Sequence, residues 1–467
     1  MKKNSVNPSE KSRTRPDSLG NDSYDVVVVG GGLAGLTQAL LLAREGFSVA
    51  CVDQEKPLTQ LDKDYDTRTT AISWGSRNVL RKAGVWEAME SAGACPIKDI
   101  RILDGASPFV LAFLSKDVEN REFGWIVDNF DLRLALHTQA GREEKLHHVT
   151  GAAVVGYERD DAAMRVRLVD GLCLSAPLVL GCDGRGSKTR EFMGIGTWGH
   201  DYGQTALVCI VEHERPHDNI AVEHFLADGP FASLPMVDDE NGRHRSAIVW
   251  SIHGGDAAQW LRCSDEAFNL RLNALYTAAK GHYRPSPRPA KNAAKNKKDL
   301  QDVRGDKPSE GGLFGAARVV GRRAGWPLGI TMAYAYIAPR MALLAEAAHG
   351  IHPIAGQGLN ISLRDVAAMT EILCDARDRG ESDWGAPALL AEYQKRRRMD
   401  NTMMGMAMEG FNGLFSNNRA PLRIMRRLGL RVIARMPAFK RFFMTQAMGT
   451  VGHVPDLVKH QDGRQSK

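Results

Sequence analysis

Short runs of hydrophobic residues, each ending in glycine or an acidic residue, mark the beginning of the chain after a polar tail. Residues 24–35 read YDVVVVGGGLAG, and four consecutive valines predict a strand buried on both faces, as in parallel sheets. An apolar helix over residues 33–44 and a second strand over residues 47–52 follow. This strand–helix–strand order predicts a βαβ unit and an α/β fold.

The glycines between the first strand and the helix point to a particular chemistry. Gly30, Gly32 and Gly35 match the pattern G-x-G-x-x-G, and Asp53 ends the second strand. In a βαβ unit such glycines allow a tight turn and a close approach of the backbone to a pyrophosphate, while the acid binds ribose hydroxyls. The pattern therefore predicts a dinucleotide site. NADP is disfavoured there, because Asp53 would repel its 2′-phosphate.

A second strand–turn–helix pattern lies near the C-terminal third of the chain. Residues 341–345 form an apolar run long enough for one buried strand, and Glu346 follows. A glycine-rich turn then precedes hydrophobic residues that recur at helical spacing from residue 359. A helix start after glycines exposes unpaired N–H groups and suits an anionic or electron-rich ligand. A tight connection without a ligand fits the same pattern, so this segment alone leaves both interpretations open.

The middle of the chain alternates strand and turn signals. Residues 154–180 predict a β-meander that runs into the turn CDGRGSKTR, where Asp183 is either a cofactor contact or an ordinary turn residue. Arg68, in DTRTTAIS after a polar loop, is either a surface charge or a contact to phosphate or flavin. Residues 129–140 predict an amphipathic helix that carries Arg133.

Composition is that of a soluble globular protein large enough for two linked domains and a tail: 467 residues, 43% hydrophobic and 25% charged. The net charge of +6 arises in two polar segments, residues 1–23 and 284–310, and the rest of the chain is balanced. This distribution argues against a basic nucleic-acid-binding face, and the second segment has no interleaved aromatic residues for base stacking. Both segments are predicted to be disordered.

Cysteine and histidine usage indicates neither disulfides nor a metal site. The seven cysteines are dispersed without a Cys-x-x-Cys pair, which indicates reduced thiols in a cytoplasmic protein. His349 and His352 have no further ligands at metal-binding spacing. The N-terminus lacks the apolar core of a secretory signal, and no apolar run reaches the roughly 18 residues of a membrane span, so we expect neither feature.

Three segments, taken in order, resemble the FAD motifs of the single-component flavoprotein aromatic hydroxylases. They are GGGLAG at residues 30–35, GCDGRGSKTR at 181–190 and AEAAHGIHPIAGQGLN at 345–360. More narrowly, the middle of the chain is similar to the ubiquinone-biosynthesis hydroxylases, in residues 202–235, 246–251 and 319–330. The resemblance covers residues 24–450 apart from the polar insertion.

The resemblance implies a Rossmann-like FAD-binding domain of the para-hydroxybenzoate hydroxylase type, with an inserted antiparallel-sheet substrate domain and C-terminal helices. The FAD-binding domain would comprise residues 24–105, 127–199 and 316–395, and the substrate domain residues 106–126 and 200–283. The chain would be completed by a disordered tail (1–23), a flexible basic insertion (284–315) and a C-terminal helical region (396–467).

The family's cofactor contacts fall, residue by residue, on matching positions of this chain. Gly32 and Gly35 would lie at the pyrophosphate, Asp53 at the ribose, and the helix start near Gly358 would stabilise negative charge on reduced flavin. The implied FAD contacts are Gly30, Gly32, Leu33, Ala34, Gly35, Asp53, Arg68, Arg133, Asp183, Glu346, Pro353, Gly356, Gln357, Gly358, Leu359 and Asn360. No residue type or spacing singles out a catalytic base.

The resemblance also implies the reaction: an FAD-dependent monooxygenase of ubiquinone biosynthesis that hydroxylates the aromatic ring of a polyprenylated phenol. It would use O₂ and an external electron donor, either NAD(P)H or a ferredoxin-type reductant, through a flavin C4a-hydroperoxide. Alternating runs over residues 200–283 predict the antiparallel sheet that would form the substrate wall. The candidate lining residues are Phe225, Leu234, Pro235 and Trp250, and the alternative for each is an ordinary core residue.

Two other functions stay open on the sequence. A flavin dehydrogenase, or an epoxidase acting on an isoprenoid, fits the same cofactor motifs. A non-catalytic subunit of a ubiquinone-biosynthesis complex is the other, because the chain has Ala345-Glu346 where family members commonly have Gly-Asp. Glu346 keeps the charge that a ribityl hydroxyl needs but is one methylene longer. We therefore expect a small outward shift of the strand end, with FAD still bound.

The C-terminal region combines apolar and basic residues. Residues 420–446 place apolar side chains near one helical face with arginines and lysines interleaved, and Pro437 should break or kink the helix. A basic amphipathic helix predicts a peripheral contact with the inner membrane. A C-terminal helix that packs on the catalytic domains explains the same pattern, and both can hold.

Overall fold

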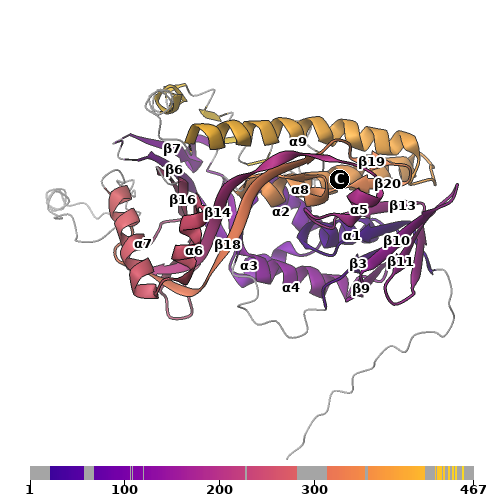
Figure 1. Cartoon of the computed structure of the whole chain (residues 1–467), viewed down its shortest axis with the longest axis horizontal. Coiled ribbons are helices and arrows are strands. Elements are labelled where there is room, and N and C mark those ends of the chain that lie inside the picture. Colours follow the sequence, from indigo (N-terminus) through magenta and orange to yellow (C-terminus); the bar gives the residue numbers. More distant parts are fainter. Residues whose placement is uncertain are drawn as a thin grey trace, which may run out of the picture.

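The computed structural model describes residues 22–56, 68–105, 107, 109–118, 120–226, 229–280, 313–352 and 356–415, and separate short stretches between 426 and 456. Figure 1 shows a parallel sheet with its helices at one end of the molecule and a larger sheet at the other. One long helix, α9 (Pro387–Phe415), runs across both. The predicted insertion at 284–310 and Pro437 lie outside the described residues.

The valine run forms the centre of the parallel sheet. β2 (Val26–Val29) is buried and pairs in parallel with β3 (Val49–Asp53) on one side and β13 (Leu178–Gly181) on the other. The strand order, in the described part of the chain, is β19-β20-β13-β2-β3-β9. The remaining strands are β9 (Leu146–Thr150), β19 (Ile337–Ala338) and β20 (Met341–Leu343). The predicted βαβ unit and Rossmann-like sheet are confirmed.

Helices cover one face of this sheet and a small four-stranded sheet covers the other, because the valines of β2 alternate between two core clusters. The helices are α1 (Leu33–Arg44), α4 (Asn129–Ala140) and α8 (Gln357–Asp378). The small sheet contains β1 (Asp22–Ser23), β10 (Val154–Arg159), β11 (Met164–Leu168) and β12 (Cys173–Ala176). Since β1 pairs with β12, residues 22 and 23 are not part of a disordered tail, contrary to the prediction.

A largely antiparallel sheet forms the second unit, in the order β21-β18-β14-β17-β16-β15-β6-β7 among the described residues. Two strands of 17 residues each, β14 (Thr197–His213) and β18 (Ala317–Ala333), run from this unit into the first (Figure 1). α6 (Gly254–Arg262) and α7 (Asp265–Lys280) cover one face of the sheet. The other strands are β6 (Asp99–Asp104), β7 (Val110–Leu114), β15 (Ile220–Leu226), β16 (Gly229–Met236), β17 (His244–His253) and β21 (His349–Gly350).

Strand pairing places three segments differently from the predicted domain boundaries. The sequence assigns residues 99–104 and 317–333 to the FAD-binding domain, but as β6 and β18 they belong to the large sheet. Conversely, β8 (Gly124–Asp128) pairs with β4 (Thr69–Ser73) and β5 (Cys95–Ile97) in a separate small sheet. Strands that pair in a sheet can be far apart in the chain, and the spacing of motifs does not reveal which strands pair.

The remaining described helices are short. These short helices are α2 (Trp74–Lys82), α3 (Trp86–Ala92), α5 (Lys188–Phe192), η1 (Ser115–Val118) and η3 (Ala345–Ala347).

The C-terminal region packs on the rest of the described structure. Leu430, Met444 and Met448 are buried in one cluster with Phe225 of β15, so the packing interpretation of this region is confirmed for these residues. No helix within the described residues is long and apolar enough to cross a membrane.

Candidate cofactor and substrate site

The start of α1 is packed on one side and open on the other. Gly30 has a left-handed backbone (φ +102°), and a Cβ on it would lie 2.5 Å from the carbonyl oxygen of Cys182. A Cβ on Gly35 would lie 1.9 Å from the carbonyl oxygen of Gly30, so both positions need glycine. At Gly32 no described atom lies within 4 Å of such a Cβ. The space beside Gly32 is therefore open, and no described side chain caps this helix start, as a pyrophosphate bound there requires.

Asp53 closes this turn from the end of β3. Its side chain is buried, one oxygen accepts the backbone N–H of Glu55 (3.0 Å), and the other would lie 2.7 Å from a Cβ on Gly31. Burial raises the pKa of Asp53, and the Glu55 N–H opposes that rise. Arg133 of α4 pairs with the Glu55 carboxylate. The structure thus brings two of the predicted contacts, Asp53 and Arg133, to the same edge of the sheet.

Two other predicted contacts have partners within the protein. The Asp183 carboxylate accepts hydrogen bonds from Ser187 Oγ (2.5 Å) and from Thr189 N and Oγ1 (2.9 and 3.0 Å), and so holds the start of α5. This geometry supports the turn interpretation of Asp183, and a cofactor contact stays a prediction. Arg68 places its guanidinium carbon 4.4 Å from the ring centroid of Trp326, which links the segment before β4 to β18.

The strand end before the glycine-rich turn differs from the prediction. β20 ends at Leu343 instead of residue 345, and η3 begins at Ala345, whose backbone is left-handed (φ +55°). A non-glycine residue in that conformation costs roughly 1–2 kcal/mol. The Glu346 side chain is half exposed and accepts a hydrogen bond from Arg185 Nε (3.2 Å), so this carboxylate points toward a protein cation. Its predicted contact with a ribityl hydroxyl stays a prediction.

The start of α8 repeats the arrangement at α1. Gly356 is left-handed (φ +63°) and a Cβ on it would lie 2.9 Å from Cβ of Ala71, whereas Gly358 faces open space among the described residues. Asn360 ties this helix start to β4: it accepts the Ser73 N–H (2.9 Å) and donates to the carbonyl oxygens of Ala71 (2.9 Å) and Gly356 (3.0 Å). Asn360 therefore fixes the position of the turn.

The other predicted contacts of these two helix starts vary in burial. Gln357 is buried, and Leu33, Ala34 and Leu359 are partly buried against the core. Pro353 lies outside the described residues.

A buried ionic network around Asp365 of α8 holds this helix against its neighbours, and the sequence analysis did not predict it. Asp365 Oδ2 accepts hydrogen bonds from His349 Nε2 (2.5 Å) and the Ala345 N–H (3.1 Å). Its Oδ1 accepts from Arg397 Nε (2.8 Å) and Asn401 Nδ2 (3.0 Å). Burial alone would raise the pKa of Asp365, but His349 and Arg397 together hold it well below its usual range. The network fixes η3 and β21, which lead directly into the glycine-rich turn.

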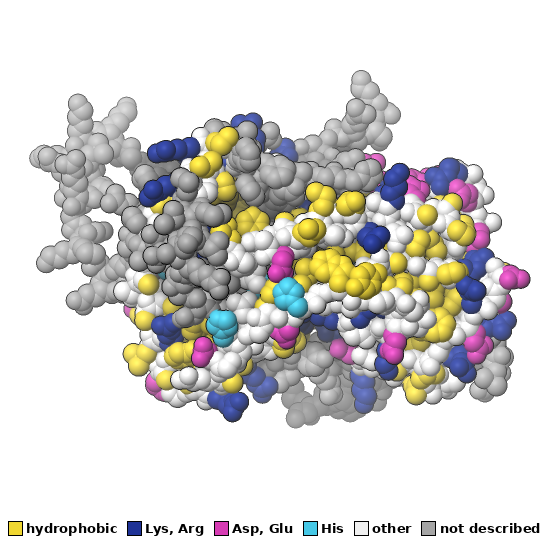
Figure 2. All heavy atoms as spheres, turned by 45° about the horizontal axis from the view of Figure 1, so that its top comes forward, with side chains coloured by type: hydrophobic (Ala, Val, Ile, Leu, Met, Phe, Trp, Pro, Cys, Tyr) yellow, Lys and Arg dark blue, Asp and Glu magenta, His cyan; other side chains and the backbone are white. Residues whose placement is uncertain are grey.

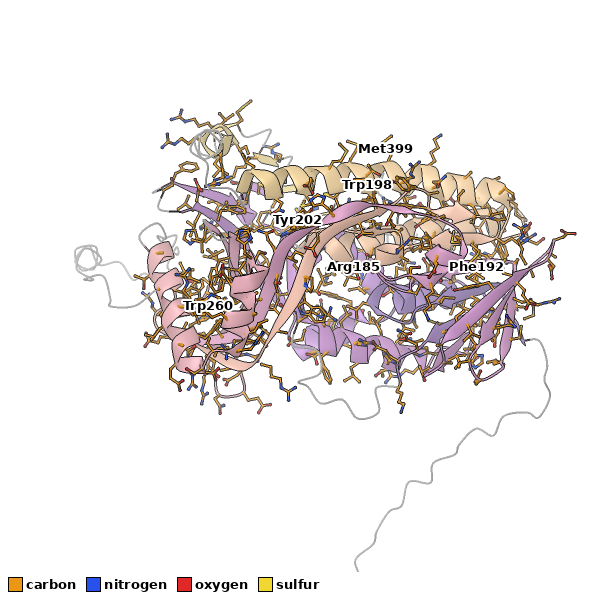
Figure 3. All side chains as sticks on the ribbon, in the orientation of Figure 1. Arg185, Phe192, Trp198, Tyr202, Trp260 and Met399 are labelled. Atoms are coloured by element: carbon orange, nitrogen blue, oxygen red, sulfur yellow. The ribbon has the colours of Figure 1, made fainter. Side chains whose placement is uncertain are left out.

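His352 precedes the turn and packs beneath α9. Its ring centroid lies 5.2 Å from that of Tyr202, whose hydroxyl donates to Glu409 Oε2 of α9 (2.6 Å). Figure 3 shows Tyr202 on β14, under that helix. Burial lowers the pKa of His352 to about 4, and the charge of Arg185 acts in the same direction. The imidazole is therefore neutral at physiological pH.

The large sheet presents an apolar face toward the FAD-binding unit. One rung of paired residues crosses six strands, from β6 through β15, β16, β17 and β14 to β18. Its members, all but Ala232 partly exposed, are Ile102, Glu223, Ala232, Val249, Val208 and Ala324. The cluster on this face also includes Ala71 and Trp74, which flank the Gly356 turn. The face is an apolar wall next to the start of α8, and its role as the substrate wall stays a prediction.

Two of the four predicted lining residues lie on this face and two do not. Phe225 and Leu234 pack in its cluster. Trp250 is buried in the opposite cluster, under α7, and Pro235 alternates with Leu234 and so points to that side as well. Trp250 and Pro235 fit the alternative that the sequence left open, that of ordinary core residues. The alternation of a strand does not reveal which of its two apolar faces borders the site.

FAD fits the groups that are present. Two helices begin at glycines with no side-chain cap among the described residues and with open space beside Gly32 and Gly358, and a buried acid ends the strand of the βαβ unit, where the family's ribose contact is expected. The buried network and Asn360 preorganise the second helix start. Among the described residues, no group of three or more His, Cys, Asp or Glu side chains is placed to hold a metal ion.

Comparison with known proteins agrees with this geometry. The FAD binding domain family matches residues 23–404. The chain is 38% identical to the ubiquinone hydroxylase UbiL of Rhodospirillum rubrum over 92% of this chain and 91% of that protein. It is 30% identical to the 3-demethoxyubiquinol 3-hydroxylase of Escherichia coli, over 92% and 99% of the two chains.

Solved structures share the fold. The p-nitrophenol 4-monooxygenase PnpA from Pseudomonas putida superimposes with a TM-score of 0.68 at 16% identity, over 91% of this chain and 98% of that chain. PqsL from Pseudomonas aeruginosa, described as a probable FAD-dependent monooxygenase, gives 0.66 at 20% identity, over 88% and 99%. The chain therefore belongs to the FAD-dependent aromatic-ring monooxygenases, in the group that contains the ubiquinone-biosynthesis hydroxylases.

Proposed function

We propose that this protein hydroxylates the ring of a polyprenylated phenol on the route to ubiquinone, with an external electron donor such as NAD(P)H and with O₂. The observation that carries the proposal is the apolar, partly exposed rung of the large sheet, which borders the start of α8. A prenylated ring needs such a wall, because burying its apolar surface supplies the binding energy. Bound FAD, once reduced, supplies the activation of O₂.

The chain's own residues bind, orient and exclude water. The starts of α1 and α8 hold the negative charges of the cofactor, and Asn360 with the Asp365 network keeps the second start in place. The sheet face, lined by aliphatic side chains around Val208 and Val249, keeps water from the reacting ring. The names of two relatives, a ubiquinone hydroxylase and a demethoxyubiquinol hydroxylase, support a quinone precursor as the substrate class.

The direct test uses purified FAD-loaded protein, a short-chain 2-prenylphenol, a reductant and isotopically labelled O₂. We expect a hydroxylated product that carries one labelled oxygen atom, detected by mass spectrometry. Oxidation without label would favour a dehydrogenase, and label in the prenyl chain would favour an epoxidase. A purified protein without a flavin spectrum would favour the non-catalytic subunit. Deletion of the gene and identification of the accumulated quinone precursor would name the ring position.

A peripheral contact with an anionic lipid surface is part of the proposal. Met399, Met403 and Met406 are 68%, 64% and 63% exposed on one side of α9, and Val432 and Met436 are also exposed. Figure 2, turned so that the α9 side comes forward, shows hydrophobic side chains in a band across this face, and Met399 projects outward in Figure 3. We expect flotation with vesicles that contain anionic lipid, weakened by salt and by Met403→Glu; unchanged flotation of that variant would remove α9 from the contact.

A further inference from the structure

Glu223 is the single charged residue in the apolar rung described above. It lies on β15, directly paired with Ile102 of β6 and with Ala232 of β16. The rung continues through Val249 and Val208, and the two residues paired directly with Glu223 are aliphatic. A carboxylate in such a setting is costly unless it has a role.

The neighbours of Glu223 on its face of the sheet include two small residues. They are Ala221, two residues earlier on β15, and Ala232, which pairs with Glu223 across the strands. Glu223 itself is partly exposed, whereas the residues flanking it on β15 are buried. Its side chain is therefore not fully enclosed by the described part of the wall.

The carboxylate has no hydrogen-bond or ion-pair partner among the described residues. Burial is the cause of the rise of its pKa to about 7, and no charged neighbour contributes to that rise. Asp104, the nearest acid on the same face of β6, is already paired with Arg426. A base with a pKa near ambient pH is well matched to proton transfer, and it is left for a ligand to satisfy.

We propose that Glu223 is the catalytic base that binds the ring hydroxyl of the substrate and takes its proton during hydroxylation. The inference rests on the proposed function and adds the residue that the sequence did not single out. Ala71 and Trp74, which flank the turn before α8, belong to the apolar cluster on this same face. A phenol held at Glu223 is thereby placed between the wall and the cofactor side of the site.

The proton and electron balance is complete with the reactants already named. The O–H bond of the phenol breaks, its proton goes to the Glu223 carboxylate, and its electron pair moves into the ring. The activated ring carbon forms a C–O bond with one oxygen atom of the activated O₂ as the O–O bond breaks, which gives a cyclohexadienone. The other oxygen atom leaves as water, formed with the two electrons of the external donor and with protons from solvent. That carbon then loses its hydrogen as a proton to solvent, and Glu223 returns its proton to the carbonyl oxygen, which restores the aromatic ring with one additional hydroxyl group.

The test compares wild type, Glu223→Gln and a matched control, Glu240→Gln, in the exposed loop after β16. With a short-chain 2-prenylphenol, reductant and labelled O₂, we expect Glu223→Gln to lower the hydroxylation rate about 100-fold or more. Its flavin spectrum and its rate of flavin reduction should stay unchanged. Wild-type hydroxylation should rise with pH through about 7, where Glu223 ionises, and this limb should be absent in Glu223→Gln.

A binding measurement separates this inference from the proposed function. Flavin absorbance is titrated with the prenylphenol and with its O-methyl ether, which cannot donate a proton. Wild type should prefer the phenol by about tenfold or more, and Glu223→Gln should show a smaller preference, because its neutral amide oxygen is a weaker acceptor than the carboxylate. Hydroxylation by wild type with the same rate, pH profile and preference in Glu223→Gln would overturn the role of Glu223 alone. Preference for the phenol without any hydroxylation would overturn the proposed function and leave Glu223 as the group that recognises the hydroxyl.

Discussion

Replacement of Asp365 by asparagine tests whether the buried network holds the turn before α8. The carboxylate accepts four hydrogen bonds, two at each oxygen, from His349, Ala345, Arg397 and Asn401. Asparagine keeps one oxygen and points an NH₂ group at the donors on the other side, so at least two charge-assisted bonds are lost. Breaking a buried ion pair costs about 3–5 kcal/mol, a large part of the roughly 5–15 kcal/mol that stabilises a typical protein.

Thermal unfolding of the FAD-loaded protein measures this cost. For a chain of this length a loss of 4 kcal/mol lowers the melting temperature by about 4 °C. FAD release should be faster, since Asp365 also binds the Ala345 N–H at the start of η3. The control is Asp400→Asn, whose side chain is 30% exposed and pairs with Arg397 (2.7 Å), with an expected cost of about 1 kcal/mol or less. Equal effects of the two substitutions would refute the reasoning.

Four further predictions follow from the structure. Gly35→Ala should prevent folding, because its Cβ would meet the Gly30 carbonyl oxygen, whereas Gly32→Ala should fold but lose FAD affinity; circular dichroism and flavin fluorescence separate the two. Ala345→Gly should change stability by less than about 1 kcal/mol, since relief of the left-handed strain offsets the greater freedom of the unfolded chain, and Ala345→Val should cost about 2 kcal/mol by denaturant titration. Burial lowers the pKa of three histidines to about 4: His148, His213 and His352. The unfolded chain therefore binds more protons below pH 6.5, and melting temperatures should fall as pH decreases from 6.5 toward 4. Glu223 has the opposite sign, so Glu223→Gln should gain stability relative to wild type as pH rises from 4.5 to 7, by about 3 kcal/mol at most; no gain would place that carboxyl in water.

The cofactor side of the site could be predicted from local patterns. The valine strand, the glycines at 30, 32 and 35, and Asp53 lie within one βαβ unit, whose geometry follows from its spacing. The helix carrying Arg133 was predicted over residues 129–140, the range in which it is found. Features of this kind depend on residues that are close together in the sequence, so local patterns are enough to predict them.

The substrate side could not be predicted in the same way. Glu223 stands in the strand IAVEHFL, and its isolation among apolar residues was a signal, but only the pairing with β6 and β16 shows which neighbours surround it. The face of β17 on which Trp250 lies could not be predicted either, because both faces of this strand are apolar. The ionic network joins His349 to Arg397, 48 positions later, and no spacing rule connects them.

The two 17-residue strands have a mechanical consequence. β14 and β18 are hydrogen-bonded to each other from Thr197 paired with Ala333 to His213 paired with Ala317, and they run through both units. One unit cannot hinge away from the other about a flexible linker, since any rotation must bend two paired strands, whose ladder is irregular between Asp201 and Gln204 and between Val208 and Ile210. Ligands must then enter through movements of loops, and denaturant should unfold the two units in one cooperative transition. A protease that cuts exposed loops should not release either unit as a separate folded domain.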